Sequence, residues 1–416
     1  MKKHSRFIYE SYIWQVKGKD LHISFIFKIE PNIYFKPKIV IKNINHSRFR
    51  KIKKEVLDNL VFHLGLMEIP TYWKAICSPE IVITAGYLSK EQIKWWQNLI
   101  IKGMGQFFYE NKLSWQKPKI TCRLGVQDPS LHMCVQGTSL HKQDYLVPMG
   151  GGKDSIVTLE ALKKQRKQVN CFVVNPNKHT KAVLRVAGIK NPIIAVRKID
   201  SKLLELNKKG YLNGHTPFTA LLSFLAVFCA ILFGYKNVAF SNEKSADQGN
   251  LKYLGKTVNH QWAKSSEFEK KFKKYIQKYL ASGVSYFSYL RKYSELEIAG
   301  MFVKYPKYFH VFSSCNAGMR ISPPKAEVFR RVKWCGSCPK CLFTYLILCP
   351  YLEKKELLRI FGKDLLREPK SLPVLMDLIG KGKHKPFECV GTYQESRKAF
   401  KLCFEKSRKE AKSVLF

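Results

Sequence analysis

Apolar and polar residues alternate along the first segment of the chain, and this pattern predicts an antiparallel sheet. The alternation runs over much of Phe7 to Asn45, with turn residues at Gly18 and Pro31, and a period of two is typical of strands with one buried face. Apolar residues then recur at helical spacing after Ser47, and again from Ser89 to Tyr109. Residues 1–140 are therefore expected to form an α+β domain.

A different pattern begins near Tyr145, where short apolar strands alternate with helices. Strands are expected at Tyr145–Met149, Val169–Val174, Pro192–Val196 and Asn237–Phe240, and helices at Ser155–Lys167, Thr180–Ala187 and from Thr216, as a capping residue, to Phe233. This alternation predicts an α/β fold with a doubly wound, mostly parallel sheet over residues 141–345. Residues 346–416 are expected to form a C-terminal region of short, basic helices.

The net charge favours anionic partners but does not distinguish among the classes of anionic partner. Lys plus Arg number 73 against 31 for Asp plus Glu, which gives a net charge of +42 and favours nucleotides, nucleic acid or acidic membranes. The lysines are scattered along the chain, so a lysine-rich lineage explains the charge equally well. The N-terminus lacks the apolar core of a secretory signal, and Ala220–Phe233 is short for a membrane span. We expect a cytoplasmic protein with no membrane span.

Residues Gly150 to Ser155 have the composition of a phosphate-binding loop. They read Gly-Gly-Gly-Lys-Asp-Ser between an expected strand and an expected helix, where backbone N–H groups and the helix N-terminus can surround phosphate oxygens. Lys153 and Ser155 add a cation and a hydroxyl, and Asp154 could help to hold Mg²⁺. The spacing of a Walker A loop is absent. An ordinary glycine turn is the alternative.

The segment resembles the Ser-Gly-Gly-x-Asp-Ser signature of the PP-loop ATP pyrophosphatase superfamily. Gly151, Gly152, Asp154 and Ser155 match that signature, whereas Gly150 stands in place of its first serine. The resemblance implies that ATP binds here and is split to AMP and pyrophosphate. It also implies that the strand end at Asn175 lies near the adenosine.

Four of the twelve cysteines have the spacing of metal ligands. Cys315, Cys335, Cys338 and Cys341 can close a tetrahedral, structural Zn²⁺ site, and an iron–sulfur cluster is the alternative. The other eight lack such spacing and are expected to be small core residues rather than disulfides. A zinc site late in the chain, after a PP-loop, also resembles 7-cyano-7-deazaguanine synthase, which implies carboxylate activation.

Further polar groups fall where doubly wound sheets bind ligands, at strand ends and helix starts. His215 precedes the long apolar helix, and Ser241, Asn242 and Glu243 follow the next strand. A third group, from Val258 to Glu269, contains His260, Lys264 and Glu267. For this third group, capping residues and a solvated helix face are the alternative interpretation.

Together these motifs resemble the UDP-N-acetyl-α-D-muramoyl-L-alanyl-L-glutamate epimerase family. The motifs are Gly-Gly-Gly-Lys-Asp-Ser, Ser-Asn-Glu-Lys-Ser-Ala, Val-Asn-His-Gln-Trp-x-Lys-Ser-x-x-Phe-Glu, Phe-Ser-Ser-Cys-Asn and Cys-Gly-x-Cys-Pro-Lys-Cys. Tyr72-Trp73-Lys74 and the segment from Gly103 to Asn111 share the likeness, although Gln106 stands where the family commonly has Glu. The likeness spans roughly residues 7 to 345.

The resemblance implies an ATP- and Mg²⁺-dependent epimerase of peptidoglycan synthesis that converts the terminal L-Glu of UDP-MurNAc-L-Ala-L-Glu to D-Glu. An acyl-adenylate would neutralise the carboxylate, so that a base could remove the α-proton before AMP is released. Ser241, Asn242 and Glu243 would join the nucleotide site, and His215, His260, Lys264 and Glu267 are the candidate bases and acids. The alternatives are a PP-loop enzyme that modifies tRNA, a carboxylate-activating enzyme similar to 7-cyano-7-deazaguanine synthase, and a zinc-stabilised RNA-binding module.

Overall fold

One large sheet runs through the N-terminal half and the middle of the chain in the computed structural model, which describes residues 5–122, 141–315 and 333–413. Its order is β13-β10-β7-β8-β9-β4-β2-β1-β5-β6, with β3 paired to β2. The strands are β1 (Arg6–Lys17), β2 (Asp20–Ile29), β3 (Ile33–Phe35), β4 (Lys38–Ile41), β5 (Glu80–Ile83), β6 (Lys119–Cys122), β7 (His141–Pro148), β8 (Gln168–Val174), β9 (Ile193–Lys198), β10 (Tyr235–Phe240) and β13 (Ser285–Ser288). A hairpin of β11 (Leu251–Tyr253) and β12 (Lys256–Val258) lies outside this sheet.

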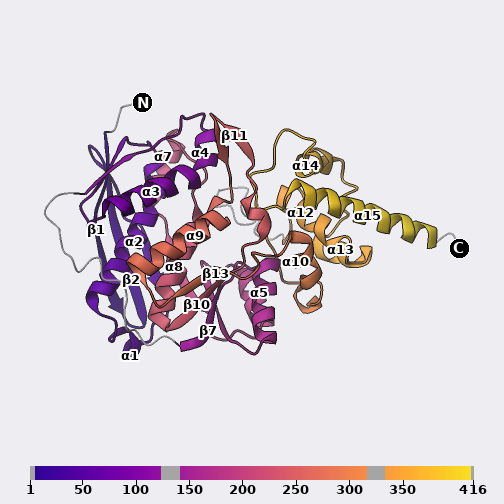
Figure 1. Ribbon diagram of the computed structural model, residues 1–416, viewed down its shortest axis with the longest axis horizontal. Helices are drawn as coiled ribbons and strands as arrows, with labels where there is room; N and C mark the ends of the chain where they lie inside the picture. The colour runs from indigo at the N-terminus through magenta and orange to yellow at the C-terminus, as the bar shows by residue number, and fades with distance from the viewer. Residues whose placement is uncertain (1–4, 123–140, 316–332, 414–416) are drawn as a thin grey trace.

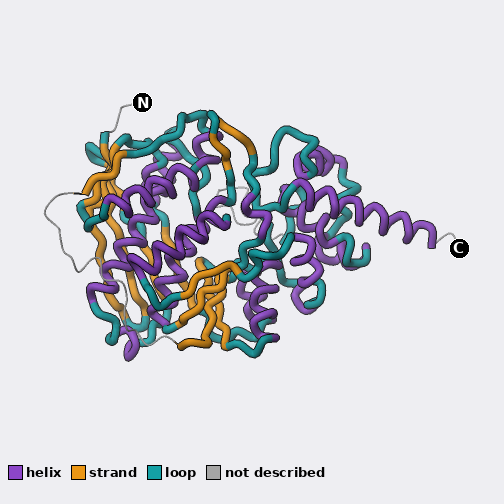
Figure 2. Tube along the Cα trace, in the orientation of Figure 1, coloured by secondary structure: helices purple, strands orange, loops and turns teal. Residues whose placement is uncertain are grey.

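The helices cover the sheet and extend beyond it at the C-terminal end (Figures 1 and 2). They are α1 (His46–Phe49), α2 (Lys54–Trp73), α3 (Lys90–Gly103), α4 (Gly105–Glu110), α5 (Lys153–Lys164), α6 (Lys178–Val186), α7 (Ser201–Lys208), α8 (Phe218–Phe233), α9 (Ser266–Tyr275), α10 (Glu295–Phe302), α12 (Pro339–Leu348), α13 (Lys354–Phe361), α14 (Leu372–Leu378) and α15 (Tyr393–Ser413). No helix in the described ranges is both long and apolar enough to span a membrane.

One half of the sheet, from its edge strand β13 to β9, is parallel and has a hydrophobic core on each face. Strands β13, β10, β7, β8 and β9 pair in parallel. Phe172 of β8 joins the core that contains α2 and α8, whereas its neighbours Cys171 and Val173 join the core that contains α5, α10 and α12. Because successive side chains of a strand point to opposite faces, helices pack on both faces. This confirms the expected α/β fold with a mostly parallel sheet.

The N-terminal strands belong to the same sheet rather than to a separate one. Strand β4 pairs antiparallel with β9, and Val40 lies opposite Val196 in that register. Helix α2 packs between β1 and α8, which explains why it is buried on nearly every side instead of being amphipathic. The sheet therefore crosses the expected boundary between residues 1–140 and 141–345, and the division of the chain into domains stays a prediction.

Three local expectations differ from the structure. Helix α8 begins at Phe218 with Pro217 in the capping position, so Thr216 is not its cap. The expected helix from Ser89 to Tyr109 is two helices, α3 and α4, which meet at Met104. The C-terminal helices are not all short, because α15 has 21 residues and runs to Ser413 (Figure 1).

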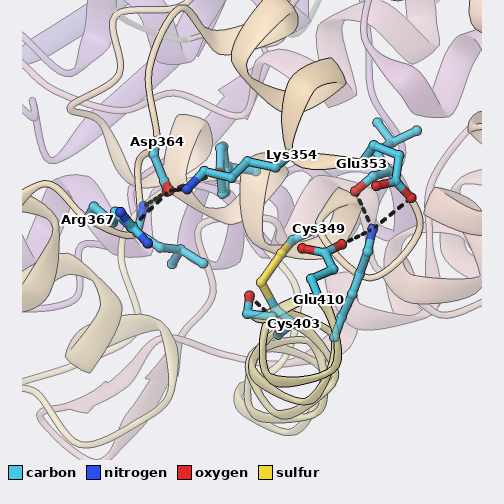
Figure 3. Close-up of a disulfide and its surroundings, with 12 residues drawn as sticks. Cys349, Glu353, Lys354, Asp364, Arg367, Cys403 and Glu410 are labelled. Atoms are coloured by element: carbon cyan, nitrogen blue, oxygen red, sulfur yellow. Dashed lines mark hydrogen bonds and ion pairs between the residues drawn. A yellow bond between two sulfur atoms is a disulfide. The ribbon is translucent and has the colours of Figure 1, made fainter. Parts of the chain in front are cut away.

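Two cysteines expected to be reduced core residues form a disulfide. Cys349, which follows α12, is bonded to Cys403 of α15 (Figure 3). The bond lies beside a cavity of about 280 Å³ that is also lined by Phe400 and Phe404. The expectation of reduced core thiols is therefore wrong for this pair. The side chains lie on two packed helices with their Cα atoms 5.5 Å apart, a juxtaposition that sequence spacing does not reveal. Cys134, another of the eight, lies outside the described residues.

Candidate active site

The glycine loop lies between β7 and α5, where the sequence placed it. Gly151 has φ of +88°, a conformation that favours glycine, and a Cβ atom there would lie 3.4 Å from Thr180 Oγ1. No side chain caps the N-terminus of α5, so the N–H groups of its first turn are not occupied by a capping side chain. The loop thus has the geometry and the polarity of an anion-binding turn.

Lys153 is buried between two carboxylates. Its ammonium group is hydrogen-bonded to both Asp154 and Glu295, and Glu295 is fully buried at the start of α10. Burial raises the pKa of Glu295 to about 7 although Lys153 opposes this shift. Burial also raises the pKa of Asp154, but Lys153 and Lys340 outweigh it and hold the pKa below its usual range. The loop therefore carries a compact cluster of one cation and two carboxyl groups.

The other expected nucleotide-site residues surround the same edge of the sheet. Ser155 Oγ donates to the carbonyl of Gly152 at 3.0 Å, so in this structure the hydroxyl stabilises the turn itself. Asn175 follows β8 with φ of +46° and is exposed, and its amide bonds the backbone of Arg197 at 2.9 Å. Since parallel strands end at one edge, this arrangement brings Asn175 to the side of the sheet that carries the loop.

Three further residues follow β10 at this edge. Asn242 is buried and donates to Ser288 Oγ at 3.0 Å, and the backbone carbonyl of Glu243 accepts from Arg291 at 2.8 Å. The hydroxyl of Ser241 is buried without a hydrogen-bond partner among the described residues. A buried hydroxyl with no partner is unfavourable, and a ligand at this edge would relieve it.

The two candidate histidines lie side by side. The ring centroids of His215 and His260 are 4.6 Å apart. Burial, with help from Lys264 and Lys385, lowers the pKa of His260 to about 3. Burial, His260 and Lys74 lower the pKa of His215 well below its usual value. Both imidazoles are therefore neutral at physiological pH, the state in which histidine accepts a proton.

Lys264 connects the histidine pair to the loop. Burial disfavours its ammonium group, but Cys389 and Glu243 outweigh burial and raise its pKa. The same ammonium group lowers the pKa of His260 and that of Asp154. Lys264 is thus a charged group that interacts with both halves of the site.

Glu267 is placed differently from the other three candidates. Its carboxylate accepts from Lys102 at 2.7 Å, from Lys271 at 2.6 Å and from Trp262 at 3.1 Å, and it is partly exposed. Burial alone would raise its pKa, but these hydrogen bonds outweigh burial and lower the pKa to about 2. Three donors already occupy this carboxylate, and no hydrogen bond among the described residues joins it to the histidine pair.

The four cysteines meet as the spacing predicted. Their sulfur atoms all lie within 4.8 Å of one another, and the sulfurs of Cys335 and Cys341 are 3.7 Å apart. A tetrahedral zinc ion with bonds of about 2.3 Å holds its sulfurs about 3.8 Å apart, so the residues fit one ion. The amide of Ser313, two residues before Cys315, donates to the carbonyl of Gly151 at 3.0 Å. The cysteine site therefore adjoins the glycine loop.

Two family models cover most of the chain. One, described as the MurL N-terminal domain, matches residues 1–289, and the other, described as the MurL C-terminal domain, matches residues 311–416. The chain belongs to the MurL family. This confirms the resemblance that the motifs carried.

Three MurL relatives carry the name UDP-N-acetyl-alpha-D-muramoyl-L-alanyl-L-glutamate epimerase. The protein of Salinispora tropica is 37% identical over 81% of this chain and 71% of its own length. That of Xanthomonas oryzae pv. oryzae is 36% identical over 81% and 72%, and that of a Micromonospora species is 40% identical over 63% and 57%. A predicted tRNA methyltransferase subunit from Methanocaldococcus jannaschii aligns over 39% of this chain and 74% of its own, at 15% identity and a TM-score of 0.25, too low to carry an argument.

Both MurL domains contribute to the site, and the sequence motifs missed part of that contribution. Lys340 is buried in the C-terminal domain, where its ammonium group bonds the carbonyl of Cys389. Lys385 is also buried, and burial lowers its pKa to about 8. Glu295 lies between the two matched ranges. In the sequence, only its position inside the Cys-Pro-Lys-Cys turn indicated that Lys340 could belong to the site. No local motif marks Lys385 or Glu295.

Proposed function

We propose that this MurL chain is an ATP- and Mg²⁺-dependent epimerase that converts the terminal L-Glu of UDP-MurNAc-L-Ala-L-Glu to D-Glu in peptidoglycan precursor synthesis. The observation that carries the proposal is the match to both MurL domains, with two relatives of that name aligned over 81% of the chain. Lys264, which acts electrostatically on both Asp154 and His260, adds support, because the reaction needs a nucleotide loop to activate the carboxylate and a base to remove the α-proton.

The glycine loop would bind the phosphates of ATP. Bound ATP supplies an adenylate of the substrate carboxylate, which removes the negative charge that otherwise opposes a carbanion, and releases pyrophosphate and later AMP. Gly150, Gly151 and Gly152 would give backbone N–H groups, and Lys153 and Ser155 would give a cation and a hydroxyl. Asn175, Ser241, Asn242 and Glu243, at the ends of β8 and β10, remain the candidates for the rest of the nucleotide.

Asp154 would hold Mg²⁺, and Glu295 would be a second carboxylate ligand. Carboxylate oxygens are the protein ligands that Mg²⁺ prefers. The two carboxyl groups now share the ammonium group of Lys153, so the position between them already holds a cation. With Mg²⁺ bound, Lys153 would be released toward the phosphates.

The histidine pair and Lys264 fit complementary parts of the proton transfer. A neutral imidazole accepts the α-proton, and the charged ammonium group of Lys264 stabilises negative charge or returns a proton. Glu267 fits the role of base least, because its carboxylate is already bound to two lysines.

The four cysteines would hold a structural zinc ion. Four thiolates complete its coordination and leave no open position for a substrate, so the ion would supply rigidity rather than chemistry. The bond between Ser313 and Gly151 would transmit that rigidity to the glycine loop.

One assay tests the activity directly. The protein is incubated with ATP, Mg²⁺ and UDP-MurNAc-L-Ala-L-Glu in D₂O, and AMP, α-deuterium and D-Glu after hydrolysis are measured. We expect all three, and each should require the complete mixture. Absence of both AMP release and deuterium exchange would contradict the proposal, as would AMP release that depends on tRNA instead of the UDP-linked substrate.

A further inference from the structure

A chain of side-chain hydrogen bonds leads from the surface to His260. Gln106 of α4 is buried, and its Nε2 donates to Glu110 Oε1 at 2.8 Å, one helical turn further along. The other end of the Gln106 amide, Oε1, lies 2.5 Å from His260 Nδ1. The three residues thus form a relay that ends on one ring nitrogen of the histidine.

The chemistry of Glu110 fixes the direction of this relay. A carboxylate only accepts hydrogen bonds, so the amide of Gln106 must turn its NH₂ group to Glu110 and its carbonyl to His260. A flipped amide would place carbonyl and carboxylate oxygens against each other. Nδ1 of His260 must therefore donate, and the lone pair of a neutral imidazole then lies on Nε2.

The ring is also held through its backbone. The amide of His260 donates to Asn250 Oδ1 at 2.8 Å. The Asn250 amide in turn donates to the carbonyls of Lys385 and Pro386, at 3.2 and 2.8 Å. No hydrogen bond to Nε2 is present in residues 5–122, 141–315 and 333–413, so no donor among these residues occupies its lone pair.

We propose that Gln106, oriented by Glu110, holds His260 in the tautomer with its proton on Nδ1, so that Nε2 is the atom that accepts the substrate α-proton. This inference rests on the proposed function and deepens it by assigning the base and its positioning residue. Nε2 takes the proton, the electron pair of the Cα–H bond moves into the activated carbonyl to give an enolate, and a donor on the opposite face returns one proton to Cα.

The charges around the pair keep His260 neutral before it accepts a proton. Lys264 and Lys385 face His260, and Lys74 faces its neighbour His215. These cations oppose an imidazolium, and an uncharged amide does not offset them. A glutamate at position 106 would offset them and raise the pKa of His260.

The tautomer of His260 can be measured independently of enzymatic activity. Nitrogen-15 NMR of the full chain, with His260→Gln to identify the signal, should show wild-type His260 protonated on Nδ1 and neutral from pH 5 to pH 8. In Gln106→Glu the same ring should begin to take up a second proton within this range, since an adjacent carboxylate raises a pKa by about one to three units. Gln116→Glu, an equal change outside the site, should leave the signal unchanged. A proton on Nε2 in the wild type, or no difference in Gln106→Glu, would overturn the proposal.

Kinetics separate this role from a merely structural one. Gln106→Met keeps the length of the side chain but removes the acceptor, and should lower α-deuterium exchange roughly 10- to 100-fold while AMP release stays within about twofold. In a His260→Gln background the same change should cause no further loss. Full exchange in Gln106→Met, or additive losses, would overturn the proposal. Failure of the proposed function would look different, because the wild type would then release no AMP whatever its tautomer.

Discussion

Lys153 shows how one side chain can serve two states of the site. Its ammonium group is 2% exposed and lies between Asp154 and Glu295. Two carboxyl groups so close, one of them fully buried, would repel each other without a cation. In this structure the lysine therefore stabilises the two carboxyl groups, and in the proposed reaction its ammonium group would turn to the phosphates.

Asp154→Asn tests the assigned role of this loop. An amide of the same shape cannot neutralise a cation, so AMP release should fall at least about 100-fold. The melting temperature should change by only a few degrees, because Lys153 keeps its bond to Glu295. Asp144→Asn, the same change in the interior of β7, is the matched control and should retain activity. Full AMP release by Asp154→Asn would show that the loop is assigned wrongly.

The histidine pair should make stability depend on pH. The pKa of His260 is about 3 in the folded chain against about 6.5 in an unfolded one, so the unfolded state binds more protons between these values. Stability is therefore complete above pH 6.5 and is lost as the pH falls, by about 2 kcal/mol at pH 5. Urea unfolding at several pH values measures the slope. His260→Gln should flatten it, whereas His46→Gln, at an exposed position, should not.

Among the elements, α12 joins the cysteine site to the C-terminal helices. It carries Cys341, and Lys340 beside it contributes to the charged cluster. The disulfide then links the end of the helix to α15 (Figure 3). We therefore expect that a change at the cysteine site or at the disulfide would alter the position of Lys340 beside the glycine loop.

Zinc removal should destabilise this part of the molecule first. We expect one zinc ion per chain by elemental analysis, and Cys338→Ser should lose it. A strong chelator should lower the melting temperature of the wild type by several degrees, because the metal stabilises the segments that it joins. The chelator should have no effect on Cys338→Ser. A metal-free protein with an unchanged melting temperature would contradict the zinc assignment, and bound iron with sulfide would replace it by a cluster.

Reduction of the disulfide should lower the stability of the C-terminal helices. The bond joins residues 54 positions apart, and a loop of this length corresponds to about 4 kcal/mol of lost chain entropy in the unfolded state. Peptide mapping without reductant should find Cys349 joined to Cys403. Cys349→Ser should then unfold at a lower urea concentration than the oxidised wild type, and equally with and without reductant.

For the chain as a whole, the continuous sheet predicts that its two halves unfold together. Glu68 of α2 is fully buried and accepts two bonds of 2.6 Å from Arg197 of β9. Glu68→Gln leaves that guanidinium without its charge partner and should cost about 3–5 kcal/mol. Urea unfolding followed by tryptophan fluorescence and by circular dichroism should give one coincident transition, shifted in the variant. Two separate transitions would show that the halves are independent.

The sequence predicted those features that local patterns determine. The alternation of strands and helices after Tyr145, the turn at Gly151 and the meeting of Cys315 with Cys338 all follow from short-range spacing. The pairing of β4 with β9 and the disulfide depend on contacts between distant segments, which no single pattern records. Buried charges such as Glu295 and Lys385 were missed for the same reason, because each resembles an ordinary surface residue until its partners are known.

The candidate site is assembled from α4, the residues before α8, the segment after β12 and the C-terminal loop that contains Lys385. Contacts between segments so far apart in sequence form late in folding, because the intervening chain must first be ordered. The contacts that hold His260 through Asn250 are therefore complete only after synthesis of the C-terminal region. A chain still emerging from the ribosome would hold the proposed ATP loop before Lys340 and Lys385 of the C-terminal domain are present, so the proposed ATP-dependent activity would begin only after that domain has folded.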